Sequence, residues 1–127
     1  MGSVDTLECH TVRVKRPLRV NYETVRRVGL DFRDVEEGTS YGTPALKAKG
    51  KLFVRLREDV DSIVIRMPFD QREEPMAADP ETYYITDHYR YGEWMLVRLS
   101  KVHADAVREL LLISYLAAGH LLRASGG

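Results

Sequence analysis

The most regular pattern of the chain is an alternation of apolar and basic residues over 46–57, interrupted by a turn at Gly50. The apolar positions are Leu46, Ala48, Leu52, Val54 and Leu56. The positions between them are mostly basic and consist of Lys47, Lys49, Lys51, Phe53, Arg55 and Arg57. Because successive side chains of a strand point to opposite faces, this period of two predicts a hairpin with one apolar and one largely basic face.

Further strands and helices are indicated on both sides of this hairpin. Apolar residues at helical spacing after the N-cap residue Asn21 predict a helix over 22–32, and a wide apolar face predicts a long helix from about Ala104 to the end of the domain. Asp70 is expected to cap a short helix ending at Ala78. Strands are expected over 35–41, 62–67, 82–86 and 94–99. Strands clustered between helices predict the α+β class, with a mostly antiparallel sheet flanked by N-terminal and C-terminal helices.

A chain of 127 residues has room for one domain. We expect a poorly ordered N-terminal arm over 1–20, a single domain over 21–122 and a frayed tail over 123–127. The longest uncharged run, 110–122, has 13 residues, whereas a membrane-spanning helix needs about 20. Residues 1–20 contain no apolar segment of a secretion signal, and the one cysteine excludes an internal disulfide, so we expect a cytoplasmic protein that does not contact a membrane.

Charge is balanced over the whole chain but not along it. Nineteen basic and nineteen acidic residues give a net charge of zero, which removes the simplest argument for a nucleic-acid-binding protein. Residues 44–66 nevertheless carry six basic and three acidic side chains, whereas residues 70–93 carry two basic and seven acidic ones. This separation predicts a polarised surface.

Four blocks of the sequence resemble the MmcQ/YjbR-like family. They are Tyr41-Gly42-Thr43-Pro44-Ala45-Leu46-Lys47, Gly50-Lys51-Leu52-Phe53-Val54-Arg55-Leu56, Pro80-Glu81-Thr82-Tyr83-Tyr84-Ile85-Thr86-Asp87-His88-Tyr89 and Leu96-Val97-Arg98-Leu99. The resemblance extends over residues 22–118. It implies a small domain of the CyaY-like fold and, from the "double wing" shape attributed to the family, binding to DNA. The chain departs from the family at Leu46, where phenylalanine is frequent, and at Ser114-Tyr115, where a Trp-Arg pair is common.

The basic face of the predicted sheet is the first candidate site. Its residues are Lys47, Lys49, Lys51, Arg55 and Arg57, which Arg66 and Arg98 would join from neighbouring strands. Such a face attracts phosphate backbones, so our first hypothesis is a non-enzymatic protein that binds DNA weakly and without sequence preference. The same residues are equally typical of the solvated face of an antiparallel sheet. A protein partner for this face is a third hypothesis.

The block Thr86-Asp87-His88-Tyr89 is the second candidate site. It predicts a pocket between the sheet and this turn, in which His88 acts as an acid or base while Arg55 or Arg98 holds an anion. On a strand, Asp87 and His88 would point to opposite faces and could not act as a pair. A purely structural role in a turn is the alternative.

Other chemistry is not indicated. The histidines have no metal-ligand spacing, the glycines form no phosphate-binding loop, and no serine or cysteine has the context of a nucleophile. We therefore predict no metal, no cofactor and no catalytic residues.

Overall fold

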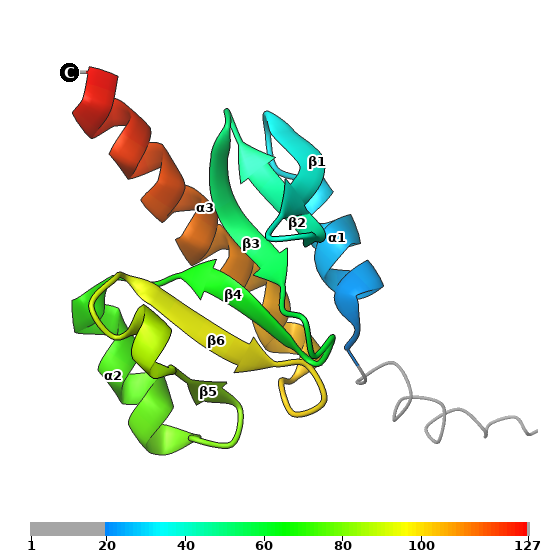
Figure 1. Cartoon of the computed structure of the whole chain (residues 1–127), viewed down its shortest axis with the longest axis vertical. Helices are drawn as coiled ribbons and strands as arrows, with labels where there is room; N and C mark the ends of the chain where they lie inside the picture. Colours follow the sequence, from blue (N-terminus) through cyan, green and yellow to red (C-terminus); the bar gives the residue numbers. More distant parts are fainter. Residues whose placement is uncertain (1–19, 127) are drawn as a thin grey trace, which may run out of the picture.

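The computed structural model describes residues 20–126, with side chains up to Gly119 (Figure 1). The arm predicted over 1–20 thus lies, apart from Val20, outside the described residues, as do the side chains of the tail predicted over 123–127. The elements are α1 (Tyr22–Leu30), β1 (Val35–Ser40), β2 (Thr43–Ala48), β3 (Lys51–Leu56), β4 (Ser62–Arg66), α2 (Phe69–Ala78), β5 (Tyr83–Tyr84), the 3₁₀ turn η2 (Asp87–Tyr89), β6 (Trp94–Arg98) and α3 (Ala104–Gly126).

The six strands form one sheet in the order β1-β2-β3-β4-β6-β5, and every neighbouring pair is antiparallel. Helices α1 and α3 pack against one face, which we name the inner face (Figure 1). The predicted α+β class and the flanking helices are confirmed. Among the described elements, no long helix crosses the centre of the opposite face, which we name the outer face.

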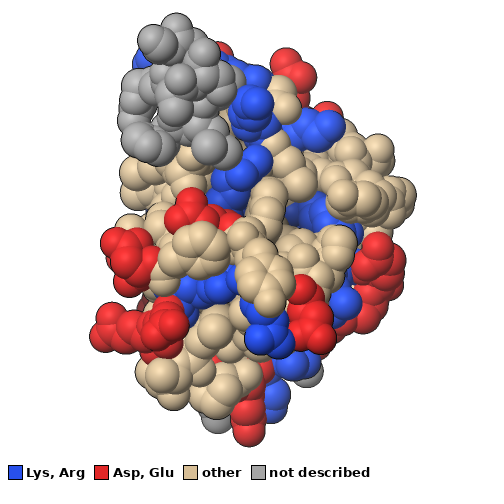
Figure 2. Space-filling model, turned by 60° about the vertical axis from the view of Figure 1, so that its left-hand side comes forward, with Lys and Arg blue, Asp and Glu red and all other residues tan. Residues whose placement is uncertain are grey.

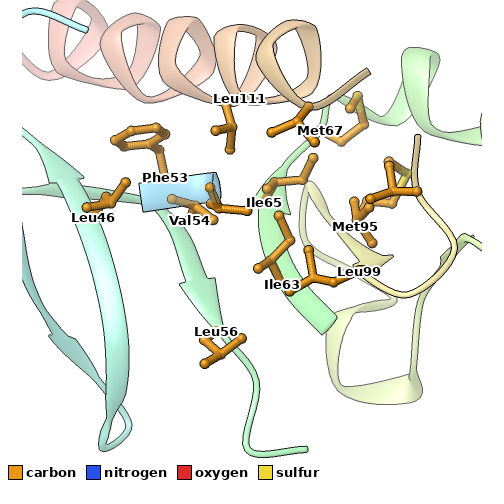
Figure 3. Packing of buried hydrophobic residues seen from close by; sticks show 14 of the residues in the cluster. Leu46, Phe53, Val54, Leu56, Ile63, Ile65, Met67, Met95, Leu99 and Leu111 are labelled. Atoms are coloured by element: carbon orange, nitrogen blue, oxygen red, sulfur yellow. The ribbon is translucent and has the colours of Figure 1, made fainter. Parts of the chain in front are cut away.

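The hydrophobic core lies between the inner face and α3. Side chains of Leu46, Val54, Ile65 and Met67 point from the strands toward Leu111 of α3, and all five are almost completely buried (Figure 3). Burial of each such side chain contributes about 1.5–3 kcal/mol to the free energy of unfolding. Most apolar residues that recur at strand or helix spacing in the sequence belong to this core.

The N-terminus of α1 is capped as predicted, whereas that of α2 is not. The side chain of Asn21 accepts a hydrogen bond from the backbone N–H of Thr24 at 3.1 Å, which confirms the predicted cap of α1. The cap predicted at Asp70 is wrong, because α2 begins one residue earlier and Pro68 stands at the N-cap position. A carboxylate of Glu93 takes the N–H of Phe69 instead, at 3.2 Å.

The β2–β3 hairpin differs from the predicted alternation because of its turn and a bulge. Lys49 and Gly50 both have positive φ, as a tight two-residue hairpin turn requires, so Ala48 lies opposite Lys51 on one face. The register then shifts by one residue, which leaves Phe53 as the additional residue of a β-bulge. Phe53 is consequently buried in the core, and the prediction that it points away from the core is wrong.

A serine of α3 hydrogen-bonds backbone groups that the bulge leaves unpaired in the sheet. The hydroxyl of Ser114 donates to the backbone carbonyl of Phe53 and accepts from the backbone N–H of Arg66 at 2.8 Å. The side chain of Arg66 donates to the carbonyl of Leu52 at 2.7 Å. These bonds satisfy backbone groups that β3 and β4 cannot pair with each other beyond Val54.

Candidate anion-binding groove

The lysines predicted to form one basic face do not lie together. Lys47 is opposite Leu52 on the outer face, whereas Lys51 is opposite Ala48 and thus on the inner side. Lys49 lies in the turn, and its Nζ is 3.8 Å from the carboxylate of Asp34. The prediction that the three lysines share a face is wrong, because a two-residue turn places the residues flanking it on one face. In the view of Figure 2, basic and acidic side chains are interspersed, and no continuous basic area is seen.

Arg55 is the basic residue that the sheet places most deeply, since only 5% of its surface is exposed. Its Nη2 donates to the hydroxyl of Tyr89 at 2.8 Å. Its Nη1 donates to the Thr43 hydroxyl at 3.2 Å and to the Leu56 carbonyl at 3.3 Å. A guanidinium has five N–H groups, so two of them, on Nε and Nη2, have no acceptor among the described residues. The nearest carboxylate, that of Glu58, is 3.7 Å away on a side chain that is 63% exposed.

Arg66 and Arg98 also belong to the outer face, where each lies over an aromatic ring. The guanidinium carbon of Arg66 is 4.4 Å from the ring centroid of Trp94, and that of Arg98 is 4.6 Å from that of Tyr84. Burial lowers the pKa of Arg66 from its ordinary value. Arg57 forms an ion pair of 3.6 Å with Asp59.

A groove opens on the outer face between the β1–β2 turn and η2. It consists of two adjoining cavities of about 340 and about 270 Å³ that share the side chains of Tyr41, Arg55, His88 and Tyr89. The larger cavity is further lined by Ser40, Leu52, Val64, Gly92 and Trp94. The smaller one is further lined by Arg57, Glu58 and Thr86. Volumes of this size are typical of sites for small molecules.

Tyr41 forms one wall of the groove in an unusual backbone conformation. Its φ is +54°, a value that a non-glycine residue adopts at a cost, and its side chain remains 76% exposed. The ring lies over the guanidinium of Arg55, with 5.0 Å between guanidinium carbon and ring centroid. The turn therefore holds an exposed aromatic ring beside a buried cation.

The block Thr86–Tyr89 forms the opposite wall. Within it, the side chains of Asp87, His88 and Tyr89 make different contacts. Tyr89 is buried against Val64 and Leu96 of the sheet, and His88 packs edge-on against the Tyr89 ring at 4.7 Å between centroids. The carboxylate of Asp87 accepts from Arg90 at 2.6 Å instead of contacting His88. A cavity lies beside this turn, with Tyr89 and His88 in its lining and Asp87 outside it, and a ligand for it stays a prediction.

Buried Arg72 holds this wall in place. From α2 its guanidinium donates to the carbonyls of Tyr89, Gly92 and Trp94 at 2.8–3.3 Å and to that of Arg90 at 3.1 Å. Four backbone acceptors of one loop thus converge on a single side chain. Arg72 was missed in the sequence, because an arginine between Gln71 and two glutamates is typical of an exposed helix surface.

The family model of YjbR matches residues 30–117, which is more than half of the chain. The chain belongs to the YjbR family. The resemblance found in the sequence is confirmed, and the matched region of this YjbR chain contains every residue that lines the groove.

A solved structure supports the fold of this YjbR chain. The crystal structure of Deinococcus radiodurans protein DR2400, described as a DUF419 domain, has a TM-score of 0.67 with 21% sequence identity, and 78% of each chain is covered. At this identity the similarity bears on the fold alone. No curated protein matches the chain.

No three His, Cys, Asp or Glu side chains within 20–119 come together as a metal ion requires. None of the described helices is both long and apolar enough to span a membrane.

Proposed function

We propose that this protein is a non-enzymatic binding protein that takes a small anionic ligand into the groove between Tyr41 and His88. The observation that carries the proposal is the position of Arg55, whose buried guanidinium borders both cavities and retains two N–H groups without a protein acceptor in the described chain. A buried cation is costly unless an anion or several acceptors compensate it. An oxyanion of a ligand supplies both.

Electrostatics in the groove favour an anion over a neutral ligand. Arg55 and Arg57 both line the smaller cavity, where Glu58 contributes one carboxylate on a mostly exposed side chain, and Asp59 pairs with Arg57 at 3.6 Å from outside the lining. Attraction between an anion and Arg55 is stronger than at the surface, because the guanidinium is shielded from water. The bidentate geometry of a guanidinium suits carboxylates and phosphates.

Binding without catalysis is favoured by the surroundings of His88. An effective general base is usually oriented by a second group, such as a carboxylate. The nearest candidate in sequence, Asp87, is bound to Arg90. The histidine ring contacts Tyr89 edge-on, which provides a wall and not a proton relay.

The single tryptophan of the chain provides the test, because Trp94 lines the groove. Titration with inorganic phosphate and with acetate is expected to change Trp94 fluorescence saturably, with weaker binding at high salt. Arg57→Gln should weaken binding by about three- to tenfold, which corresponds to about 0.7–1.4 kcal/mol. Lys49→Gln, the same charge change in the turn outside the groove, is the control. No saturable change with either anion would refute the proposal.

DNA binding, the first hypothesis from the sequence, is a second candidate on a revised set of residues. The observation that favours it is the pairing of arginines with aromatic rings on the outer face, Arg66 with Trp94 and Arg98 with Tyr84. Arginine and aromatic side chains together provide phosphate contacts and stacking surfaces for single strands.

Fluorescence anisotropy with labelled single-stranded and duplex DNA at two salt concentrations tests this second candidate. We expect salt-sensitive binding that the double change Arg66→Gln and Arg98→Gln weakens. The double change Lys49→Gln and Lys51→Gln removes the same charge away from the outer face and should have little effect. Absence of binding at low salt, or equal effects of the two double changes, would contradict it.

A further inference from the structure

The two cavities of the groove differ in chemistry although they share walls. The larger cavity is completed mostly by apolar and aromatic side chains, Leu52, Val64 and Trp94, together with Ser40 and Gly92. The smaller cavity is completed by polar and charged side chains, Arg57, Glu58 and Thr86. A ligand that occupies both must therefore carry an apolar part and a charged part.

We propose that the ligand consists of an aromatic ring linked to a small oxyanion, with the ring in the larger cavity and the oxyanion at Arg55 and Arg57. The proposal rests on the proposed function and specifies the chemical class of its ligand. An aryl phosphate, a nucleotide and an aryl carboxylate all have this chemistry.

The walls of the larger cavity are suited to a planar ring. Tyr41 on one side and Tyr89 and Trp94 on the other supply aromatic surfaces, and aromatic pairs are stabilised beyond the area that they bury. Tyr41 and Gly42 form the two-residue turn between β1 and β2, in which both φ values are positive, and this turn holds the exposed ring of Tyr41 at the rim. An inserted ring would cover this exposed surface.

The smaller cavity is suited to an oxyanion of limited size. Arg55, near the end of β3, and Arg57, just after that strand, both line this cavity, and Thr86, a residue with a hydroxyl group, lines it as well. Glu58 opposes the anion, since its carboxylate already approaches Arg55 to 3.7 Å. A ligand oxyanion would take the place of this carboxylate, which can swing into solvent because its side chain is mostly exposed.

The test compares phenyl phosphate, inorganic phosphate and phenol as ligands of the full chain. Their affinities are measured by isothermal titration calorimetry and by changes in amide chemical shifts. We expect phenyl phosphate to bind at least about tenfold more tightly than either fragment, because only it uses both cavities. Equal affinity for phenyl phosphate and inorganic phosphate would overturn the inference and leave the anion site standing. Equal affinity for phenyl phosphate and phenol, or no binding of any of the three, would overturn both proposals.

Paired variants locate the two parts of the ligand. Tyr41→Asn removes the ring but keeps a residue that tolerates positive φ. Because Tyr41 also borders the smaller cavity and lies over Arg55, affinity for inorganic phosphate should fall too, but affinity for phenyl phosphate should fall by a larger factor. Arg57→Gln should lower affinity for both phosphates. Tyr91→Asn removes an exposed tyrosine outside the groove lining and is the matched control. An equal loss of affinity for the two ligands in Tyr41→Asn would contradict the placement of the ring.

Glu58→Gln should raise the affinity for phenyl phosphate, which the Tyr41 and Arg57 changes should lower. Removing the competing carboxylate should tighten binding of phenyl phosphate by about three- to tenfold, because the ligand oxyanion no longer has to displace the Glu58 carboxylate from Arg55. Unchanged or weaker binding would contradict the assignment of the oxyanion to this cavity. Adenosine monophosphate and benzoate then distinguish the sources, since preference for one of them identifies a nucleotide or an aryl carboxylate.

Discussion

The guanidinium of Arg55 on β3 and the hydroxyl of Tyr89 in η2 are joined by a hydrogen bond of 2.8 Å across the outer face of the sheet. The two residues are 34 positions apart in the sequence. This bond connects the floor of the groove to one of its walls. It also gives a buried cation one of its few partners, so the stability of the fold and the shape of the groove depend on the same contact.

Tyr89→Phe is expected to destabilise the protein by about 1–2 kcal/mol, because it leaves a buried N–H of Arg55 without an acceptor while the ring still fills its space. Urea unfolding followed by circular dichroism measures the change. Tyr91→Phe, at a side chain that is 87% exposed, should be within about 0.5 kcal/mol of the original protein. Equal effects of the two changes would contradict the role of the bond.

Ser114→Ala should lower the free energy of unfolding by about 1–3 kcal/mol. The hydroxyl bonds both the carbonyl of Phe53 and the N–H of Arg66, and its loss leaves two buried backbone groups unpaired. Amide hydrogen exchange at Arg66 should also become faster than at Ile63, which is paired within the sheet. Glu109→Gln, an exposed change on the same helix, is the control. A loss below about 0.5 kcal/mol would show that water replaces the hydroxyl.

Arg72→Met should loosen the wall of the groove more than it alters the core. Four carbonyls of residues 89–94 lose their donor, while the methionine still fills much of the space of the side chain. We expect faster hydrogen exchange over 89–94 and at least about threefold weaker binding of phenyl phosphate, with core strands β3 and β4 still protected. Unchanged exchange in this loop would exclude the proposed positioning role.

The ionisation of Tyr22 should lower the stability of the protein at alkaline pH. Burial raises the pKa of its hydroxyl from 10.0 to about 12, with the carboxylate of Glu37 as the second cause. Because the folded-state pKa lies above the unfolded value, the contribution to stability is complete below pH 10 and is lost as the pH rises through about 12. Tyr22→Phe should flatten this part of the stability profile, measured by urea unfolding between pH 9 and about 12. An unchanged slope would contradict the raised pKa.

Sequence reasoning placed part of the sheet correctly. The periodicity of 46–57 correctly placed Val54 and Leu56 in the core and Arg55 on the other face, whereas Leu52, expected on the apolar face, lies opposite Lys47 on the outer face. Tyr41 and Trp94 were missed as lining residues. Nothing in their sequence neighbourhood distinguishes an aromatic side chain at a groove from one in a core.

The predicted basic face also joined Lys51 to Arg55, and this part of it failed for a reason that local patterns do not contain. Alternation assumes a strand without irregularities, whereas the bulge at Phe53 places two successive side chains on the inner side. The bulge is stabilised by Ser114, which is 61 residues away in the sequence. The alternation of residues within β3 does not indicate that a hydroxyl from α3 will bond to its backbone.

The sequence by itself determined the strands and helices, their order, the inner face of the sheet and the family, because these follow from hydrophobic spacing, from the Asn21 cap and from short motifs. Only the tertiary structure decided which cations are buried, which lie over aromatic rings and which meet across the groove. Arg55, Arg57, Lys49 and Lys51 look equivalent along the chain. They become different because burial and charge depend on neighbours from distant segments, and those neighbours are defined only when the sheet and its turns have formed.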